Sequence, residues 1–548
     1  MSATPSSANP SSTTVDAVVV GAGFSGLYML HRLRQLGLTA RLFEAASGVG
    51  GTWWWNRYPG ARVDIESMEY SYSFSEELEA EWEWSERYAT QPELLAYLDH
   101  VAERFDLKRD IQFDTRVTAA TFDETANRWT IETDCGDWVS ARYCIMATGC
   151  LSVANAPAFP GLESFKGKTY QTGHWPHEGV DFTGQRVGVI GTGSSAIQSI
   201  PRIAEQAAHL HVFQRTPNFS VPAHNGPLDP AFLADWKANR AQYRREGREN
   251  GFGIRALDSS EQLAVETPAE ERRRIYEDRW ARGGFSLVGA FADLIFDPAA
   301  NASAAEFVGS KIREIVKDPQ VAETLFPRSY PVATKRLCVD TDYYATFNRD
   351  NVTLVDVAAA PIEAITPTGL RTTQAEYELD AIVFAIGFDA MTGALNSIDI
   401  RGRGGVALKD RWAEGPRTYL GLMVAGFPNL FIVTGPGSPS VLCNMAVAIE
   451  QHVGWIADCI GHLSERQLAA IEATSGAQDA WVDHVNEVAD MTLYPQANSW
   501  YIGANVPGKP RVFMPYIGGF PAYREKCEQV AAAGYEGFAL SSAASTSG

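Results

Sequence analysis

The sequence predicts an α/β protein with two similar βαβ units, because one glycine-rich pattern occurs twice along the chain. Each copy follows a short apolar run, Ala17–Val20 or Val187–Ile190, and precedes a segment with helical spacing. Continuous β-branched runs of this kind are typical of strands that are buried on both faces of a parallel sheet. The two units therefore predict two Rossmann-like sheets in one chain.

The glycines of each copy lie where a strand turns into a helix. Glycine allows the tight turn, lets the backbone approach a pyrophosphate at the helix N-terminus, and lets the helix pack closely on the strand. The first copy contains Gly21, Gly23 and Gly26, and the second contains Gly191, Gly193, Ser194, Ser195 and Ala196. Because the third position serves helix packing, we expect the methyl group of Ala196 to be tolerated there.

The second strand of each unit ends in a charged residue, and the two charges are opposite. Glu44 follows the first glycine pattern at nearly the distance at which Arg215, with Thr216 beside it, follows the second. A carboxylate at this position accepts hydrogen bonds from a ribose diol, whereas a guanidinium binds a 2′-phosphate. The pair predicts FAD in the first unit and NADPH in the second, and so electron transfer from nicotinamide to flavin.

Composition excludes several other classes of protein. A formal net charge of −20 argues against binding to nucleic acid or to an anionic membrane surface. No run of residues approaches the roughly 18–20 apolar residues that a membrane span needs. The seven cysteines are scattered and show no Cys-x-x-Cys spacing. We therefore expect no disulfide framework and no metal site, and a reducing, cytoplasmic location.

The chain divides into parts of different composition. We expect disordered tails at residues 1–14, which are rich in Ser, Thr, Pro and Ala, and at residues 541–548, which are similar in composition. The FAD-binding domain is expected at 15–150 and 388–540, and the NADP-binding domain at 151–220 and 331–387. Residues 221–330 are rich in Ala, Arg and Glu with helical spacing, which predicts a helical insertion.

Two further segments have unusual sequences. The loop Gly50–Asp64 holds three consecutive tryptophans between glycine turns, which indicates either a core aromatic cluster or a wall around a flavin or substrate. Residues 165–176 precede the second nucleotide strand, and their composition alone is that of an interdomain linker.

Together these segments resemble the type I, FAD-dependent Baeyer–Villiger monooxygenases, over essentially the whole chain after the first tail. Within that family the chain is most similar to the enzymes that act on phenylacetone and on steroids. The family fingerprint F-x-G-x-x-x-H-x-x-x-W-[PD] is matched by Phe165, Gly167, Trp175 and Pro176. In the tryptophan loop, Gly51, Trp53, Tyr58-Pro59-Gly60 and Asp64 also follow the family pattern. The resemblance implies that Gly51, Thr52, Trp53 and Asp64 bind a cofactor.

The chain departs from the family at two positions. Gln171 stands where the fingerprint has His, and Ile386 stands where Thr is usual in the Ala385-Ile386-Gly387 stretch. A glutamine amide forms hydrogen bonds but takes up no proton near neutral pH. If the family histidine acts by its charge, coupling between NADPH binding and oxygenation is altered here; if it acts by orientation, little changes.

The resemblance implies roles for particular residues. Arg336 is the expected catalytic cation and Asp64 its partner, while Lys335 joins Arg215 at the 2′-phosphate. Trp500 is expected in a lid near the nicotinamide ribose or substrate, and Tyr70 near the flavin. The expected substrate pocket contains Ser440, Val441, Leu442, Met445 and Cys150, although apolar residues of this kind are also typical of a core.

The resemblance also implies a reaction. NADPH reduces FAD, O2 gives a C4a-peroxyflavin, and one oxygen atom is inserted beside a ketone carbonyl to form an ester or lactone plus water. Bulky, aryl or cyclic ketones are expected, and sulfides are allowed. The alternatives are a flavin monooxygenase acting on sulfide or amine heteroatoms, and a nucleotide-binding redox sensor without turnover. A flavin disulfide reductase is disfavoured, because Cys144 and Cys150 lack redox spacing. We expect a monomer.

Overall fold

The computed structural model describes residues 13–542. Residues 13 and 14 begin strand β1 (Thr13–Val20) and residues 541 and 542 end strand β20 (Phe538–Ser542), so the expected tails are each two residues too long. The remaining tail residues, 1–12 and 543–548, lie outside the described part. Within that part, no helix is long and apolar enough to cross a lipid bilayer.

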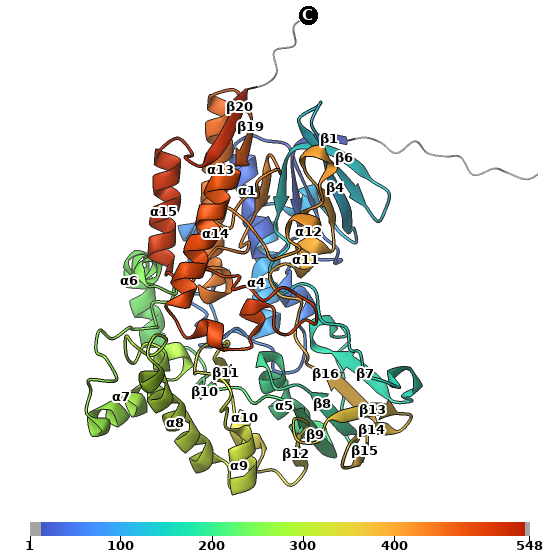
Figure 1. Ribbon diagram of the computed structural model, residues 1–548, viewed down its shortest axis with the longest axis vertical. Helices are drawn as coiled ribbons and strands as arrows, with labels where there is room; N and C mark the ends of the chain where they lie inside the picture. Colours follow the sequence, from blue (N-terminus) through green and yellow to red (C-terminus); the bar gives the residue numbers. More distant parts are fainter. Residues whose placement is uncertain (1–12, 543–548) are drawn as a thin grey trace, which may run out of the picture.

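The first sheet contains eight strands and includes the first glycine unit (Figure 1). Its strand order is β17-β4-β5-β6-β1-β2-β3, and β18 also pairs with β6. Strands β1, β2, β3 and β18 are parallel to their neighbours, whereas β4, β5 and β6 form an antiparallel meander. The remaining bounds are β2 (Ala40–Phe43), β3 (Ile111–Gln112), β4 (Val117–Asp123), β5 (Arg128–Thr133), β6 (Trp138–Met146), β17 (Asp399–Arg401) and β18 (Leu430–Ile432).

Helices from both ends of the chain cover this sheet. Helix α1 (Phe24–Gln35) packs beside α13 (Met445–Glu465), whose N-cap Asn444 accepts a hydrogen bond from the Ala446 amide. The late part of the chain therefore returns to the first sheet. The other helices and strands of this half are α2 (Thr52–Trp55), α3 (Glu76–Glu81), α4 (Gln91–Arg104), α11 (Gly393–Asn396), α12 (Leu408–Arg411), β19 (Leu468–Ala473), α14 (Ser475–Asp490) and α15 (Phe520–Ala532).

The second sheet contains five parallel strands in the order β12-β9-β8-β16-β7. Helix α5 (Ser194–Gln206) begins at the second glycine pattern, as the sequence predicts. The strand bounds are β7 (Lys168–Gln171), β8 (Arg186–Ile190), β9 (His209–Gln214), β12 (Val352–Asp356) and β16 (Ala381–Phe384). A separate three-stranded sheet, β13 (Ile362–Thr366), β14 (Gly369–Thr372) and β15 (Glu376–Glu378), lies beside it.

Between β9 and β12 the chain forms a helical region (Figure 1). Aspartates 229, 297 and 318 cap three of its helices with their side chains, and a proline follows each of them. The pair β10 (Ser220–Pro222) and β11 (Cys338–Asp340) brings its two ends together. The helices are α6 (Pro230–Glu249), α7 (Ala269–Arg282), α8 (Pro298–Ile315) and α9 (Pro319–Leu325), followed by the short α10 (Tyr343–Thr346).

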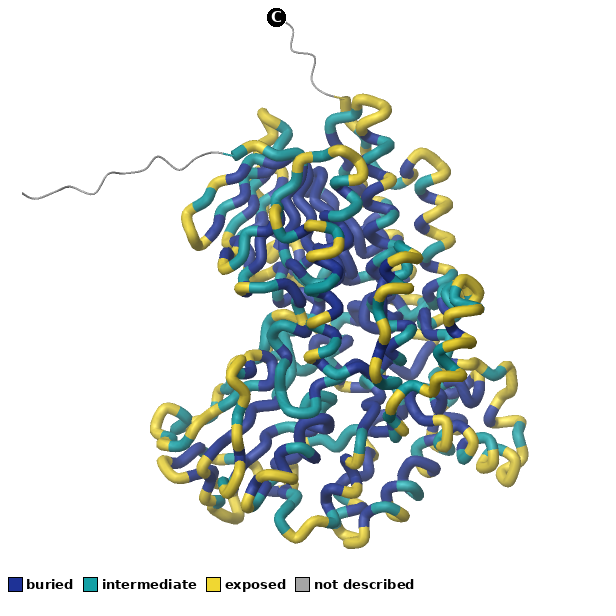
Figure 2. Tube along the Cα trace, turned by 180° about the vertical axis from the view of Figure 1, so that it is seen from behind, coloured by how far each residue is buried: buried dark blue, intermediate teal, exposed yellow. Residues whose placement is uncertain are grey.

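Apolar side chains fill both faces of each sheet. Figure 2 shows the buried trace inside the upper and lower halves, with exposed residues along the rims. One core joins α1 and α13 to the first sheet, and another joins the second sheet to the helical region. Because the helical region shares the core of the second sheet while α6 contacts α15 of the first half, it bridges the two halves.

The glycine loops of the two units are built alike. Gly21 and Gly191 have φ angles of +104° and +111°, and a Cβ on either would meet the carbonyl oxygen of Ala147 or Ala385. The third positions differ. Ala196 is fully buried with its methyl accommodated, whereas a Cβ at Gly26 would lie 1.8 Å from the Gly21 carbonyl oxygen. The first loop therefore requires glycine where the second accepts alanine.

We predict that Gly26→Ala destabilises the first glycine loop, because the added methyl must displace the Gly21 backbone. Overpacking of this kind costs about 1–3 kcal/mol, so the variant should melt at lower temperature and retain less flavin per chain. Gly476→Ala is the control, since a Cβ there meets nothing within 4 Å. Wild-type melting and flavin content in Gly26→Ala would contradict the prediction.

Candidate active site

The first glycine loop and the tryptophan loop form one backbone cradle. The Gly50 amide donates to the Ala22 carbonyl at 3.0 Å. A Cβ on Gly51, whose φ is +53°, would lie 2.9 Å from the Gly23 Cα. The two loops approach at backbone distance because neither residue has a side chain. Gly21, Gly23, Gly26, Gly51 and Thr52 are thus brought together.

Glu44 lies at the end of β2 and is bonded to this cradle. Its carboxylate accepts from the amides of Ala22 at 2.6 Å and Ala46 at 2.8 Å. Burial raises the pKa of Glu44, and these amide hydrogen bonds act in the opposite direction. The carboxylate therefore lies beside the glycine loop, where it could accept hydrogen bonds from the ribose of a bound dinucleotide.

The three tryptophans have different surroundings. Trp53 is buried and meets Tyr70 edge-on, with ring centroids 5.9 Å apart. Trp54 packs against His177, and Trp55 against His174. The tryptophan loop thus holds the segment that contains the fingerprint, a contact between two motifs that the sequence does not reveal.

The fingerprint segment is part of the second sheet rather than a linker. Residues 168–171 form its edge strand β7. A Cβ on Gly167 would lie 2.5 Å from the Phe165 ring, which explains the spacing of this pair, and Trp175 is buried against Tyr170. Pro176, the last residue of the motif, follows Trp175 and is partly buried.

The two departures from the family pattern meet through one residue. Gln171 donates from Nε2 to the carbonyl of Asn155 at 2.6 Å. The Asn155 side chain in turn donates to the carbonyl of Ile386 at 3.1 Å, and its amide donates to Gly387. Gln171 and Ile386 are therefore joined in a chain of neutral hydrogen bonds.

The second glycine loop lies beside two cations. Thr192 donates from Oγ1 to the Thr216 carbonyl at 2.9 Å, which ties the Gly191–Ser195 turn to the end of β9. Arg215 is exposed there. Burial lowers the pKa of Lys335, and the nearby Arg215 charge lowers it further. Two cations held close together without a carboxylate between them form a site for an anion.

Arg336 is fixed by two distant segments. Its Nε and Nη2 donate to the two carboxylate oxygens of Asp64 at 2.9 and 2.8 Å, and its Nη1 donates to the carbonyl of Val441 at 2.9 Å. The guanidinium also lies 4.8 Å from the centre of the Phe285 ring. Burial disfavours the cation, but the Asp64 charge outweighs it and raises the pKa of Arg336.

The expected pocket residues gather in one apolar cluster. Cys150, Val441 and Leu442 belong to its buried part, and Met445 and Trp500 pack against it. Ser440 is fully buried beside them and donates to the Thr434 carbonyl. Burial raises the pKa of Cys150 to about 11, so its thiol stays protonated and acts as an apolar group at neutral pH.

The sequence gives no signal for several neighbours of Arg336. Phe285 belongs to the helical region, where aromatic residues are expected in the core. Burial raises the pKa values of Tyr494 and Tyr501, and the charge of Arg336 acts in the opposite direction on both. A cavity of about 270 Å³ is lined by Asp64 and by Phe285, whose ring packs on Arg336. Its other walls are partly apolar and partly polar or charged: Ile65, Glu66, Arg87, Tyr88, Ile254, Ala256, Leu257, Arg282, Gly283 and Ser286.

Comparison with known proteins identifies the family of this chain. A family model described as pyridine nucleotide-disulphide oxidoreductase matches residues 18–250. A Baeyer–Villiger monooxygenase of Pseudooceanicola batsensis is 46% identical over 95% of both chains. The chain belongs to the FAD-dependent Baeyer–Villiger monooxygenases.

Solved structures of this Baeyer–Villiger family share the fold. An oxidized steroid monooxygenase bound to NADP is 57% identical, with a TM-score of 0.93 over 96% of this chain and all of that one. A further family structure is a complex with FAD and NADP. A phenazine N-monooxygenase of Lysobacter antibioticus is also similar, 43% identical over 97% of this chain and 98% of that one.

The residues of this monooxygenase fit the two cofactors of its family, FAD and NADP(H). The cradle at Gly23 and Gly51 leaves only backbone at its surface, as close approach of a pyrophosphate requires. A Cβ on Gly193 would meet nothing within 4 Å, so the second loop is also open. The paired cations Arg215 and Lys335 suit a 2′-phosphate.

We predict that Arg215→Ala raises KM for NADPH far more than KM for NADH, because only NADPH carries the 2′-phosphate. Loss of a charge-assisted contact of about 1.5–3 kcal/mol corresponds to roughly 10- to 150-fold. Steady-state kinetics with both nucleotides measures the ratio. An equal change for both nucleotides would assign Arg215 no part in phosphate recognition.

Proposed function

We propose that this enzyme inserts one oxygen atom of O2 beside the carbonyl of a bulky, aryl or cyclic ketone, giving an ester or lactone plus water. The observation that carries the proposal is a partly buried arginine, held by a carboxylate, beside the apolar cluster that contains Val441. When bound, FAD and NADPH supply the electrons and the activation of oxygen. The protein positions the reactants, supplies charge and excludes water.

Arg336 is the catalytic cation in this proposal. A guanidinium has five N–H donors, and three of its nitrogens already bind Asp64 and Val441. The two remaining N–H groups are available to an oxygen that gains negative charge, such as the carbonyl oxygen of the attacked ketone. Because Asp64 and burial fix the side chain beforehand, no reorganisation is needed at the moment of reaction.

Asp64 is a positioning residue. Its two oxygens hold the guanidinium plane in a fork geometry that lysine could not reproduce. Asp64 also neutralises the cation before any anion develops on the substrate. Its charge offsets the free-energy cost of removing the Arg336 guanidinium from water. Without Asp64, Arg336 would keep only the Val441 carbonyl among these partners.

The remaining candidate residues divide between the two cofactors and the substrate. We assign Glu44, Tyr70, Trp53 and Thr52 with the first glycine loop to FAD. Arg215, Thr216 and Lys335 with the second loop are assigned to NADPH. Trp500 lies on the apolar cluster next to Tyr501, 4.2 Å away between ring centroids, and is assigned to the boundary between nicotinamide and substrate.

The proposed pocket residues favour apolar ketones. Val441, Leu442, Met445 and Cys150 offer no charge, and the Ser440 hydroxyl is already bonded. An apolar lining favours hydrocarbon next to the carbonyl and leaves Arg336 as the polar group that orients it.

One chain is the proposed working unit, and the cytoplasm its location. Both nucleotide loops, Arg336, Asp64 and the apolar cluster come from the same chain. All seven cysteines lie in the described residues and none is bonded to another, which suits a reducing compartment.

A second candidate function is oxygenation of a sulfide or amine. It is favoured by the similarity to an N-monooxygenase at 43% identity. A heteroatom lone pair needs no cation on a developing alkoxide, so the two reactions make different demands on Arg336.

We predict that Arg336→Ala abolishes ester formation while NADPH still bleaches the flavin, because the arginine stabilises charge only in the oxygenation half of the cycle. Arg336→Lys should recover little, since an ammonium cannot bind both Asp64 oxygens in one plane. Anaerobic stopped-flow reduction and product analysis separate the two half-reactions. Ester formation retained in Arg336→Ala would refute the assignment.

We predict esters or lactones from a mixed panel of aryl, cyclic and bulky ketones supplied with NADPH and O2. Thioanisole and a tertiary amine belong in the same panel. Mass spectrometry identifies the products and NADPH consumption gives the coupling. Oxidation of the heteroatoms alone, without ester from any ketone, would favour the second function over the first.

A further inference from the structure

We propose that Glu69 is a positioning residue that sets how much room a bulky ketone has beside Asp64, the partner of Arg336, by holding residues 254–257 of the helical region in place. This inference rests on the proposed function, because it concerns the cavity that Asp64 and Phe285 line next to Arg336. Glu69 contacts no reacting atom in this proposal; it acts through the backbone segment that it binds.

Glu69 is a buried carboxylate with an unusual pair of partners. The residue is only 5% exposed, although its side chain is ionisable. Its two oxygens accept from the backbone amides of Arg255 at 2.5 Å and Ala256 at 3.0 Å. These bonds cross between halves of the molecule, since Glu69 follows the tryptophan loop and the amides belong to the helical region.

The segment that Glu69 holds forms a wall of the cavity next to the Arg336–Asp64 pair. Ile254, Ala256 and Leu257 line this cavity together with Asp64 and Phe285. The segment therefore lines one space together with Asp64 and with the Phe285 ring that packs on Arg336. A small shift of the segment changes the room available to a ketone without moving Arg336.

The same segment also touches the loop at the start of α13. The carbonyl of Phe252 accepts from the Asn444 amide at 2.8 Å, and a Cβ on Gly253 would lie 2.6 Å from the Cys443 sulfur. Asn444 in turn donates from Nδ2 to the backbone carbonyl of Glu69 at 2.9 Å. Glu69 is thus bonded to the insertion segment and to the loop that contains Val441 and Leu442.

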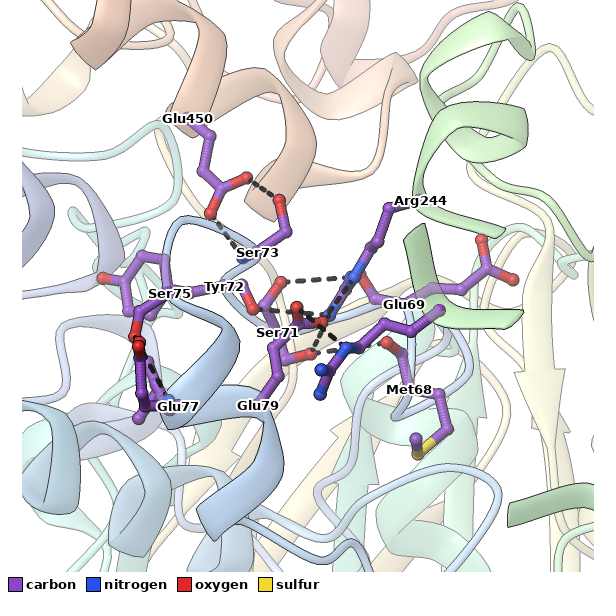
Figure 3. A network of polar contacts seen from close by, with 12 residues as sticks. Met68, Glu69, Ser71, Tyr72, Ser73, Ser75, Glu77, Glu79, Arg244 and Glu450 are labelled. Carbon is purple, nitrogen blue, oxygen red and sulfur yellow. Dashed lines mark hydrogen bonds and ion pairs between the residues drawn. The ribbon is translucent and has the colours of Figure 1, made fainter. Parts of the chain in front are cut away.

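The charges around Glu69 come from three elements. Figure 3 shows Arg244 reaching from α6 toward Glu69, Ser71 and Glu79. Arg244 pairs with Glu79 at 2.7 Å, and both side chains are 9% exposed. Glu66 is on the same loop as Glu69 and pairs with Arg87, while Arg255 turns its own guanidinium to Glu246. The charge of Arg244 therefore acts on both Glu79 and Glu69, but its ion pair is with Glu79. Glu69 forms no ion pair with any of these groups.

This environment makes the interaction sensitive to pH. Burial, reinforced by the charge of Glu66, raises the pKa of Glu69 to about 7, although the two amides and Arg244 favour the ionised form. Protonation removes the negative charge and places a hydrogen on an oxygen that faces an N–H donor. The segment is therefore held less firmly as the pH falls below about 7.

Stability has the opposite pH dependence. The folded-state pKa of Glu69 is above its ordinary value of 4.5, so the folded chain binds the proton more tightly than the unfolded chain. Its contribution to the free energy of unfolding consequently falls as pH rises between about 4.5 and 7. If KM rose because the whole protein became less stable, the rise would grow with increasing pH. If KM rises because protonated Glu69 releases residues 254–257, the rise grows with decreasing pH.

The test compares Glu69→Gln with the wild-type holoenzyme in two measurements. The first is amide hydrogen exchange of peptides covering residues 251–258, which needs no turnover. The second is KM for 4-phenylcyclohexanone relative to KM for cyclohexanone between pH 6 and pH 8.5. Glutamine keeps the shape of the glutamate side chain but places an NH2 group against the backbone amide of Arg255 or Ala256. One hydrogen bond is then lost, so amide exchange of residues 251–258 should become faster.

We expect KM for the bulky ketone to rise about 3- to 10-fold in Glu69→Gln at pH 8, with flavin reduction by NADPH unchanged. In the wild type the same KM should rise as pH falls through 7, and the variant should lose this dependence. Unchanged exchange of residues 251–258 overturns the proposal, whether or not any ester forms. Failure of the wild type to form ester from either ketone instead refutes the proposed function.

Glu450→Gln is the matched control. Glu450 is also a buried carboxylate with a raised pKa that accepts from a backbone amide and a hydroxyl, both of Ser73 (Figure 3). No hydrogen bond joins its side chain to residues 251–258. This variant should leave their exchange and the ratio of the two KM values as in the wild type. An equal effect in both variants would overturn the specific role of Glu69.

Discussion

The bond between Arg336 and Asp64 is the constraint on which the rest of the site depends. A guanidinium that is largely removed from water, as Arg336 is, is unfavourable unless a carboxylate and further acceptors bind it. Asp64 comes from the tryptophan loop of the first half, Arg336 from the chain that leaves the helical region, and the Val441 carbonyl from the pocket loop. Satisfying one cation therefore requires three distant segments to meet, and the pocket forms where they do.

Contacts between the tryptophan loop and the fingerprint segment join the two nucleotide units. Trp54 and Trp55 contact the rings of His177 and His174, and the Trp175 amide donates to the Trp55 carbonyl. These contacts are mostly aromatic or neutral. The relative placement of the two sheets is consequently maintained by packing and backbone hydrogen bonds, while charge is concentrated at Arg336 and at the anion site of Arg215 and Lys335.

The fingerprint motif identifies the family, but most of its residues have structural rather than chemical roles. Phe165 covers Gly167, and Trp175 is buried beside Tyr170, so these residues build the edge strand β7. Gln171 is the polar member, and its side chain is engaged with a backbone carbonyl. Here a neutral amide can perform the orienting part of the interaction, whereas any role that depends on a proton is lost with the histidine.

The sequence by itself determined the two glycine units, the opposite charges of Glu44 and Arg215, the helical region and the family, because these follow from local patterns with fixed spacing. Only the tertiary structure decided that Phe285 lies on Arg336, that the tryptophans support the fingerprint, and that Glu69 holds residues 255 and 256. Such contacts join residues as many as 187 positions apart. No local pattern encodes them, because burial and hydrogen-bond satisfaction are settled only when the whole chain has folded.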